Sequence, residues 1–189
     1  MRASTLKTSV YIATTLDGFI ARKNGELDWL PGSDGKMDEN HGNEDYGYNS
    51  FMDSIDVLVM GKNTYELVLS SGNWPYGSKK VIVLSKTLNQ LADKTSNSVE
   101  IKSCSPKDLY AELEVSGAKH IYIDGGKTIQ GFLEAGLINE ITITKVPVII
   151  GSGIPLFGPL SSDIHLRPLE AKSFQNGFVQ NKYEIIKMK

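Results

Sequence analysis

The sequence predicts an open α/β protein whose sheet is mostly parallel and ends in an antiparallel hairpin, with about eight strands and four helices. Three observations support this fold class. Short, uniformly apolar runs recur in the first two thirds of the chain, as in strands that are covered on both faces. Helical segments separate these runs. After residue 138 the apolar residues alternate with polar ones, as in antiparallel strands.

The apolar runs and the segments between them give the elements in order. The predicted parallel strands are 9–13 (SVYIA), 56–60 (DVLVM), 80–84 (KVIVL) and 120–124 (HIYID). A helix is predicted to open at Asn63 and Thr64. Another is predicted from Ser105, where Pro106 at the first helical position completes a capping-box pattern.

The later elements follow the same reasoning. The capped helix is predicted to end at Gly117, and a further helix is predicted over 128–136 (TIQGFLEAG). The antiparallel strands are predicted within 138–150, 163–174 and 177–187. Asn176–Gly177 separates the last two, and Asn-Gly between alternating runs is a strong hairpin signal.

Length and composition predict one globular domain over residues 1–189. The chain is 40% hydrophobic and 22% charged, with a net charge of -2. It has no large basic field, so we expect no nucleic-acid or membrane partner. Cys104 is the only cysteine, and the N-terminus lacks the apolar core of a signal peptide. A cytoplasmic location is therefore expected.

Three predicted strand ends share one design. The second strand is followed by Gly61, Lys62 and Thr64, the third by Ser85 and Lys86, and the fourth by Gly125, Gly126, Lys127 and Thr128. Ligands of open α/β sheets bind beyond the carboxyl ends of the strands, where helix N-termini and glycines favour phosphate. For one strand end alone, a glycine that makes a turn and a lysine exposed to solvent would explain the pattern without a ligand. Three such ends together favour a multiply phosphorylated ligand.

Other chemistries are weakly supported. Gly126–Thr128 resembles the end of a P-loop, but Ile121 occupies the position of the required glycine. His41, His120 and His165 lack the spacing of metal ligands, so no metal site is expected. No G-x-S-x-G motif is present, which argues against covalent hydrolysis.

Asp45 is the main candidate for proton handling. A helix over 44–54 would place Tyr48 and Met52 on its face, and apolar neighbours would raise the pKa of its carboxyl. The alternative is a charge that stabilises a helix N-terminus. The polar stretch 31–47 before the helix is either a mobile loop or the rim of a site.

Several motifs taken together resemble a known family. They are TLDGFIARKNGELDWL, VLVMGKNTYE, VIVLSKT, IYIDGGKTIQGFL and ITKVPVIIGSGIPLFG. In this order and spacing they resemble the dihydrofolate-reductase-like superfamily, over about residues 8–187. The branch with the strongest resemblance holds the C-terminal reductase domain of bacterial riboflavin biosynthesis and stand-alone proteins like it. The resemblance implies an eight-stranded sheet, NADPH as the hydride donor, and a homodimer formed through the late antiparallel strands.

The resemblance also implies roles for individual residues. Gly61, Lys62, Thr64, Gly125, Gly126, Lys127 and Thr128 would hold the pyrophosphate, Ser85 and Lys86 would lie near the 2′-phosphate, Ala13 and Ile20 would flank the nicotinamide, and Asp17, Gly18 and Trp29 would belong to a lid over it. Asp45 and Thr144 fall where folate reductases carry a pocket acid and a threonine bonded to it.

The sequence departs from true folate reductases at the substrate end. No arginine lies between Arg22 and Arg167 to bind a folate tail. The resemblance therefore favours an NADPH-dependent reductase of the riboflavin-pathway type, which transfers hydride to a pyrimidine- or pterin-type heterocycle or to its sugar. The alternatives are a dihydrofolate reductase and, from a different class, an NADPH-binding sensor without catalysis.

Overall fold

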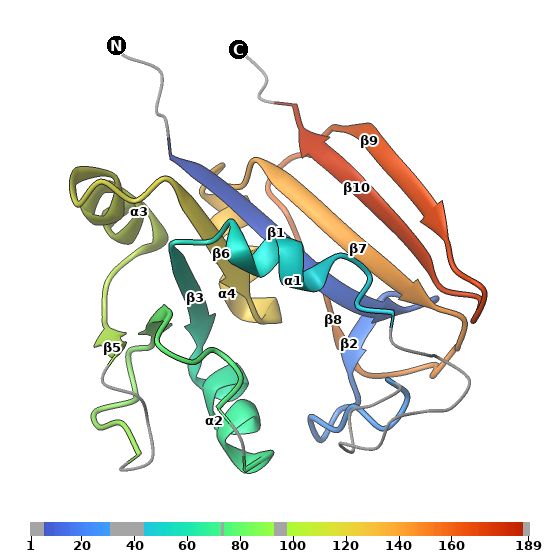
Figure 1. Cartoon of the computed structure of the whole chain (residues 1–189), viewed down its shortest axis with the longest axis horizontal. Helices are drawn as coiled ribbons and strands as arrows, with labels where there is room; N and C mark the ends of the chain where they lie inside the picture. Colours follow the sequence, from blue (N-terminus) through green and yellow to red (C-terminus); the bar gives the residue numbers. More distant parts are fainter. Residues whose placement is uncertain (1–5, 31–43, 73, 93–97, 187–189) are drawn as a thin grey trace. The chain divides into compact units, whose positions relative to one another are not determined.

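The computed structural model of the chain describes residues 6–30, 44–72, 74–92 and 98–186 (Figure 1). The strands are β1 (Lys7–Thr15), β2 (Phe19–Ala21), β3 (Val57–Gly61), β4 (Lys80–Leu84), β5 (Val99–Lys102), β6 (His120–Asp124), β7 (Glu140–Val146), β8 (Ile154–Pro155), β9 (Leu166–Ser173) and β10 (Val179–Ile185). The helices are α1 (Tyr48–Asp53), α2 (Lys62–Ser70), α3 (Pro106–Val115) and α4 (Gly126–Glu134).

Eight of the strands form one sheet in the order β5-β4-β3-β6-β1-β7-β10-β9. The pairs β5–β4, β4–β3, β3–β6 and β6–β1 are parallel, whereas β7–β10 and β10–β9 are antiparallel. The short strands β2 and β8 pair separately. The predicted fold class is confirmed, including the mostly parallel sheet and the antiparallel C-terminal strands.

The chain divides into two compact units. Unit 1 consists of Met1–Ser9 and Ser54–Asn139, and unit 2 consists of Val10–Asp53 and Glu140–Lys189. Strand β1 contributes its first three residues to unit 1 and the remainder to unit 2. The expected single domain over residues 1–189 stays a prediction.

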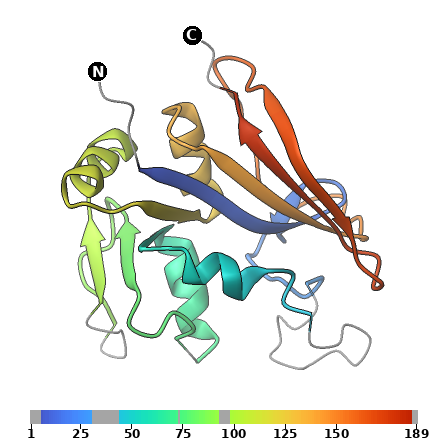
Figure 2. The same ribbon diagram turned by 45° about the horizontal axis from the view of Figure 1, so that its top comes forward.

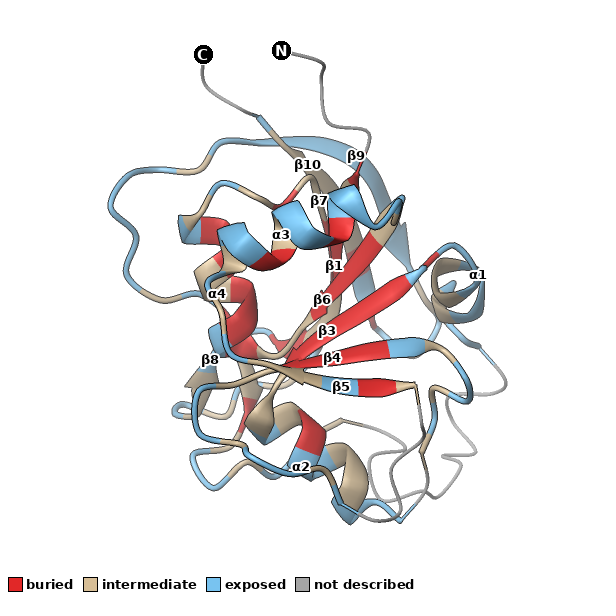
Figure 3. Cartoon of the chain, turned by 90° about the vertical axis from the view of Figure 1, so that its left-hand side faces the viewer, coloured by how far each residue is buried: buried red, intermediate tan, exposed pale blue. Residues whose placement is uncertain are grey.

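The core of unit 1 follows from its uniformly apolar strands. Leu58, Val59 and Met60 of β3 are fully buried, as are the central residues of β4 and β6 (Figure 3). Helix α2 packs on β3 and β4, while α4 packs on β3, β6 and α3. The β3–α2–β4 and β5–α3–β6 crossovers run in opposite directions across the sheet. Because such crossovers are right-handed, α2 and α3 cover opposite faces.

Helix α3 begins and ends where the sequence predicts. The Ser105 hydroxyl accepts a hydrogen bond from the Asp108 N–H at 3.2 Å and donates to the Asp108 carboxylate at 2.7 Å. After the helix, Gly117 has a φ of 85°, which suits glycine better than any other residue. Of the helices in the described residues, none is both long and apolar enough to cross a membrane.

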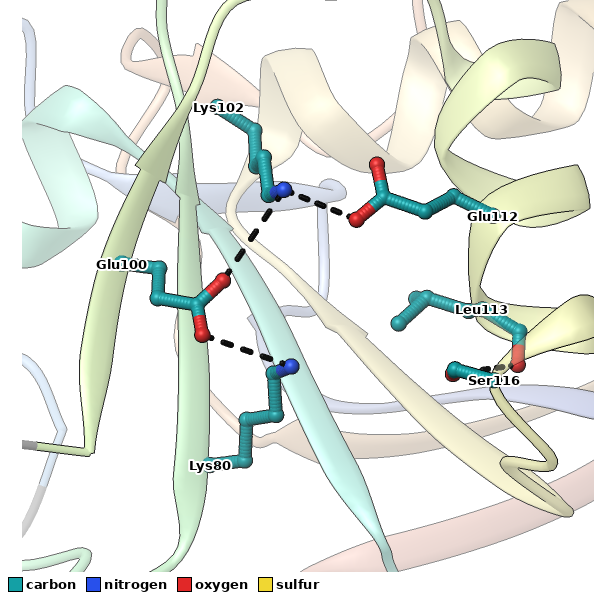
Figure 4. Close-up of polar contacts among 6 residues, drawn as sticks. All are labelled: Lys80, Glu100, Lys102, Glu112, Leu113 and Ser116. Atoms are coloured by element: carbon teal, nitrogen blue, oxygen red, sulfur yellow. Dashed lines mark hydrogen bonds and ion pairs between the residues drawn. The ribbon is translucent and has the colours of Figure 1, made fainter.

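Strand β5, at one edge of the sheet, is held by a network of ion pairs (Figure 4). Glu100 of β5 pairs with Lys80 of β4 at 3.4 Å, and Lys102 of β5 pairs with Glu112 of α3 at 2.7 Å. Charged side chains on an edge strand discourage pairing with foreign strands. Strand β5 was not predicted, because its charges interrupt the apolar pattern.

Unit 2 contains the antiparallel strands β7, β10 and β9 (Figure 2). The predicted Asn176–Gly177 turn joins β9 to β10, and Gly177 has a φ of 86°. All eight residues of β9 are exposed. Pro168 in β9 lies beside an irregularity in the pairing register at Lys182 and Tyr183. Proline and a bulge are common features of edge strands that do not accept another strand.

Candidate functional site

In unit 1, the three strands whose ends were singled out stop at the same edge of the sheet, next to one another. Strand β3 lies between β4 and β6 and is parallel to both. Gly61 of β3 pairs with Leu84 of β4, and Met60 pairs with Asp124 of β6. Ser85 and Gly125 therefore leave their strands beside the point where Gly61 enters α2. The structure thus brings the three strand ends together.

Two of these strand ends lead directly into helices with open N-termini. Gly61 is the N-cap of α2 and Gly125 is the N-cap of α4, and neither helix has a side-chain cap. Helix α3, in contrast, is capped by Ser105. The first backbone N–H groups of α2 and α4 have no capping side chain, which suits them to bind an anion.

The N-termini of α2 and α4 pack closely against each other at two places, each of which pairs a glycine with a threonine. A Cβ atom added to Gly61 would lie 2.9 Å from the Thr128 hydroxyl, and one added to Gly125 would lie 2.3 Å from the Thr64 hydroxyl. Each threonine thus fills the space beside the other helix's glycine. Gly125 also has a φ of 86° and a ψ of 135°, a conformation that favours glycine. Together these contacts form a close-packed cradle of glycines and hydroxyls.

The lysines of the strand ends have different surroundings. Lys62 lies 3.6 Å from Glu66 in an exposed i,i+4 pair, which is a weak interaction. Lys86 and Lys127 are exposed and pair with no acid in the described part of the chain. The Ser85 hydroxyl oxygen accepts hydrogen bonds from the N–H groups of Thr87 and Leu88, both at 3.1 Å, and so holds the turn after β4. Its role is at least partly structural.

Asp124, the last residue of β6, is a candidate site residue that the sequence motifs did not predict. Burial raises the pKa of its carboxyl to about 6, despite hydrogen bonds from the Gly125 N–H, at 2.8 Å, and from Tyr122. The carboxyl is enclosed by protein although the residue keeps some accessible surface. A buried carboxyl with a strongly raised pKa is a candidate functional group, and this one lies where β6 leads into α4. The available signal was a lone acid that ends an apolar strand just before two glycines.

The position and the pKa of Asp45, in unit 2, differ from those predicted. The expected helix over 44–54 is confined to Tyr48–Asp53, and Asp45 precedes it as an exposed residue. Its carboxylate accepts hydrogen bonds from the N–H groups of Gly47, at 2.8 Å, and Asn49, at 3.1 Å. These bonds lower the pKa of Asp45, so the predicted rise was wrong. The two backbone donors stabilise the charged form and outweigh the small opposing effect of desolvation.

Thr144 is buried in β7 but is not bonded to Asp45. Its hydroxyl oxygen instead accepts a hydrogen bond from the Gln180 side-chain amide of β10 at 2.9 Å. The same amide donates to the Tyr11 hydroxyl at 2.8 Å. Sequence patterning could not identify Gln180 or Tyr11, because their proximity depends on the pairing of strands far apart in the chain.

The segment predicted as a lid makes several hydrogen bonds to other parts of unit 2. The Gly18 carbonyl accepts a hydrogen bond from the N–H of Leu156, the residue after β8, and the strand β2 that follows Gly18 pairs with β8. The Asp17 carboxylate accepts hydrogen bonds from the backbone of Ile150 and Gly151. Trp29 is buried against an apolar cluster.

The remaining predicted residues lie as follows. Ala13 in β1 and Ile20 in β2 are half-buried. His120 makes a structural contact, since its ring nitrogens lie 2.8 Å from the Ser9 hydroxyl and 3.2 Å from the Ser54 hydroxyl. His41 and most of the polar stretch 31–47, namely 31–43, lie outside the described residues.

The fold and the strand ends together define a class: α/β proteins in which helices with glycine N-caps open from the carboxyl ends of a mostly parallel sheet. The chain belongs to the RibD C-terminal domain family, whose model matches residues 7–180. The resemblance stated from the sequence motifs is thereby confirmed.

Known proteins resemble the chain over most of its length. The structure is similar to that of a candidate riboflavin biosynthesis protein from Shewanella sp. PV-4, with a TM-score of 0.88 and 38% identity, covering 96% of this chain and 100% of that one. Protein YwjB of Bacillus subtilis strain 168 is 34% identical over 170 residues, covering 89% of this chain and 92% of YwjB. The riboflavin biosynthesis protein RibD of Corynebacterium ammoniagenes is 23% identical over 165 residues, covering 80% of this chain and 46% of RibD.

Proposed function

We propose that the chain is an NADPH-dependent reductase that transfers hydride to a pyrimidine- or pterin-type heterocycle or to its sugar. The activity is of the 5-amino-6-(5-phosphoribosylamino)uracil reductase type, and it is exercised in the cytoplasm. The observation that carries the proposal is the cradle in unit 1, where Gly61 and Gly125 open two uncapped helices side by side. Membership of the RibD C-terminal domain family supports the same activity.

The residues of unit 1 fit a dinucleotide with an additional phosphate. The backbone N–H groups at the starts of α2 and α4 would bind the pyrophosphate, because glycine N-caps let phosphate oxygens approach the backbone. Lys86 follows the neighbouring strand end and has no acidic partner in the described residues, so its charge is available to the 2′-phosphate. When bound, NADPH supplies the hydride.

Hydride addition leaves negative charge on the acceptor, so the reaction also needs a proton. Asp124 is not assigned this role, because its carboxyl is enclosed by protein and bonded to the Gly125 N–H and to Tyr122. The pKa of Asp45 is lowered, so this carboxyl is ionised near neutral pH. We assign it, with Thr144, to hydrogen bonding of the heterocycle.

The test combines cofactor binding with turnover. NADPH binding is measured by calorimetry, and NADPH oxidation is followed with the phosphoribosylaminouracil substrate, dihydrofolate and simple pterins. We expect binding of NADPH and oxidation with the aminouracil. Oxidation only with dihydrofolate would replace the proposal by a dihydrofolate reductase. Tight NADPH binding without turnover of any substrate would indicate a sensor, and no binding at millimolar NADPH would end the proposal.

Asp45→Asn tests the substrate role of this residue. The substitution removes the negative charge and keeps a similar shape, so the affinity for NADPH should stay unchanged while turnover falls about tenfold. Steady-state kinetics and cofactor titration on the same preparation measure both quantities. Unchanged turnover would remove Asp45 from the mechanism.

We propose further that the protein forms a homodimer through the β9–β10 face of unit 2. Exposed apolar side chains gather on and next to these strands: Leu166, Leu169, Val179 and Ile186 are 38–47% exposed. Pro168 and the register irregularity disfavour edge-to-edge pairing. A second copy would therefore pack against the face of the hairpin rather than extend the sheet.

A further inference from the structure

Tyr46 has an unusual backbone conformation. It lies in unit 2, directly after Asp45, and its φ of 56° is the only positive φ of a non-glycine residue in the described part of the chain. A side chain is unfavourable in this left-handed conformation, because its Cβ approaches the following carbonyl oxygen. A strained residue of this kind persists only where the surrounding structure determines it. The contacts of Tyr46 therefore show what holds this turn in place.

The side chain of Tyr46 is held by the turn between β9 and β10, which is also in unit 2. Its hydroxyl oxygen accepts a hydrogen bond from the Asn176 side-chain amide at 2.6 Å. Its ring stacks on Phe178, with the ring centroids 5.3 Å apart, and packs edge-on against Phe174, with the centroids 4.8 Å apart. The C-terminal hairpin thus contacts both the ring and the hydroxyl of Tyr46.

The backbone carbonyl of Tyr46 is also fixed by distant parts of unit 2. It accepts hydrogen bonds from the Tyr11 hydroxyl at 2.5 Å and from the Gln180 side-chain amide at 3.2 Å. The same amide donates to the Tyr11 hydroxyl at 2.8 Å, and Gln180 is only 7% exposed. Turning this carbonyl away would leave buried polar groups without their partners. Strands β1 and β10 therefore determine its orientation.

The fixed turn determines where the next backbone N–H groups point. The N–H groups of Gly47 and Asn49 donate to the two oxygens of the Asp45 carboxylate, at 2.8 Å and 3.1 Å. Tyr46 lies between the carboxylate and both donors along the chain, so a change in its backbone angles would separate them. Asp45 itself is exposed, so hydrogen bonds rather than close packing orient its carboxylate.

We propose that Tyr46 is a positioning residue, which the hairpin and β1 anchor and which holds the Asp45 carboxylate in one orientation for the heterocycle. The inference rests on the proposed function, which assigns Asp45 to hydrogen bonding of the heterocycle. In the alternative account, Asp45 and its two donors form the turn by themselves and the tyrosine is only tolerated there. Tyr46→Gly separates the two accounts. Glycine adopts a positive φ without strain, so it would favour a self-supporting turn, whereas it removes the anchor that we propose.

The first measurement is the pKa of the Asp45 carboxyl, followed by carbon NMR and assigned by the loss of its signal in Asp45→Asn. Tyr46→Gly should raise this pKa, because the two backbone donors would no longer be held against the carboxylate. Tyr46→Phe is the matched variant: it keeps the ring and loses only the bond to Asn176, so it should raise the pKa less. An unchanged or lower pKa in Tyr46→Gly would overturn the inference in favour of the self-supporting turn.

The second measurement is a double-mutant cycle of Tyr46→Gly and Asp45→Asn on turnover. Tyr46→Gly alone should lower turnover about fivefold, and by less than about twofold in the Asp45→Asn background. A residue that acts only through a carboxylate has little effect once the carboxylate is removed. The affinity for NADPH should stay unchanged in every variant. Equal losses in the two backgrounds, or full turnover by Asp45→Asn, would contradict a positioning role.

A further variant covers a failure of Tyr46→Gly to fold, which melting curves detect. Tyr46→Asn also removes the ring, and asparagine tolerates a positive φ. It should raise the pKa of Asp45 as Tyr46→Gly does, and the same outcomes decide the inference. If the wild-type protein binds no NADPH and turns over no substrate, the proposed function fails. The pKa comparison needs neither ligand, so it still decides whether Tyr46 holds the carboxylate.

Discussion

Replacing Gly125 by alanine tests the packing of the two helix N-termini. The change has two costs. Alanine must adopt a φ of 86° with a ψ of 135°, which costs about 1–3 kcal/mol. Its Cβ must also fit 2.3 Å from the Thr64 hydroxyl, and such overpacking costs about 1–3 kcal/mol. Alanine also lowers the conformational entropy of the unfolded chain, which offsets about 0.4–1 kcal/mol of this destabilisation. The free energy of unfolding should therefore fall by about 1–5.6 kcal/mol.

Two comparisons separate these costs. Gly117→Ala also places alanine at a positive φ, of 85°, but no atom lies within 4 Å of the new Cβ. It should destabilise by no more than about 1.5 kcal/mol. In a Thr64→Ala background the overlap disappears, so Gly125→Ala should cost about 1–3 kcal/mol less than it does beside Thr64.

The assay is urea unfolding of the four combinations of residues 64 and 125, together with Gly117→Ala, monitored by circular dichroism. The coupling energy of the double-mutant cycle measures the contact directly. If Gly125→Ala has the same effect with and without the Thr64 side chain, the two helix N-termini are not packed as described, and the argument for a preformed cradle fails.

Three other perturbations give independent checks. Asp124 has a pKa of about 6 in the folded protein, above the ordinary value of 3.8 for an aspartate. The folded protein therefore holds a proton that the unfolded chain has lost, and stability falls as pH rises through that window. Asp124→Asn should remove this loss, on the order of 1–3 kcal/mol between about pH 4 and pH 8 in urea unfolding, and a pH-independent difference would contradict the buried carboxyl. Lys86→Glu should weaken NADPH about tenfold more than NADH in cofactor titrations, and equal weakening would count against a 2′-phosphate contact. Leu169→Glu should shift the dimer toward monomer in light scattering, because it buries a charge in the proposed apolar interface, and a wild-type protein that is already monomeric would exclude that interface.

The fold was largely predictable because its parallel strands are buried on both faces. The bounds of β4 and β6 agree with the apolar runs that predicted them, and β3 is shifted by one residue, from the predicted 56–60 to Val57–Gly61. Strand β5 was missed because it is a four-residue edge strand with alternating charges. Strand β8 was missed because two residues, one of them proline, give no periodic signal.

The candidate site was predictable to the extent that it follows directly from strand ends. Glycine, lysine and threonine after an apolar run indicate an open helix N-terminus, and parallel pairing then brings such ends together. The protonation of the carboxyls was not predictable in this way. Asp45 has a lowered pKa because of two backbone donors, and Asp124 has a raised pKa because of burial. Both depend on three-dimensional surroundings that spacing in the sequence does not specify.

The unequal packing of the three strand ends has a consequence for engineering. Gly61 and Gly125 are each confined by a threonine of the other helix, so neither segment can be altered without disturbing its counterpart. The turn after β4 has its own internal support from the Ser85 hydroxyl, and Lys86 beside it is exposed. Under the proposed NADPH site, libraries that aim to switch coenzyme preference should therefore keep Ser85 and diversify Lys86 and Thr87, which lie outside the glycine–threonine contacts.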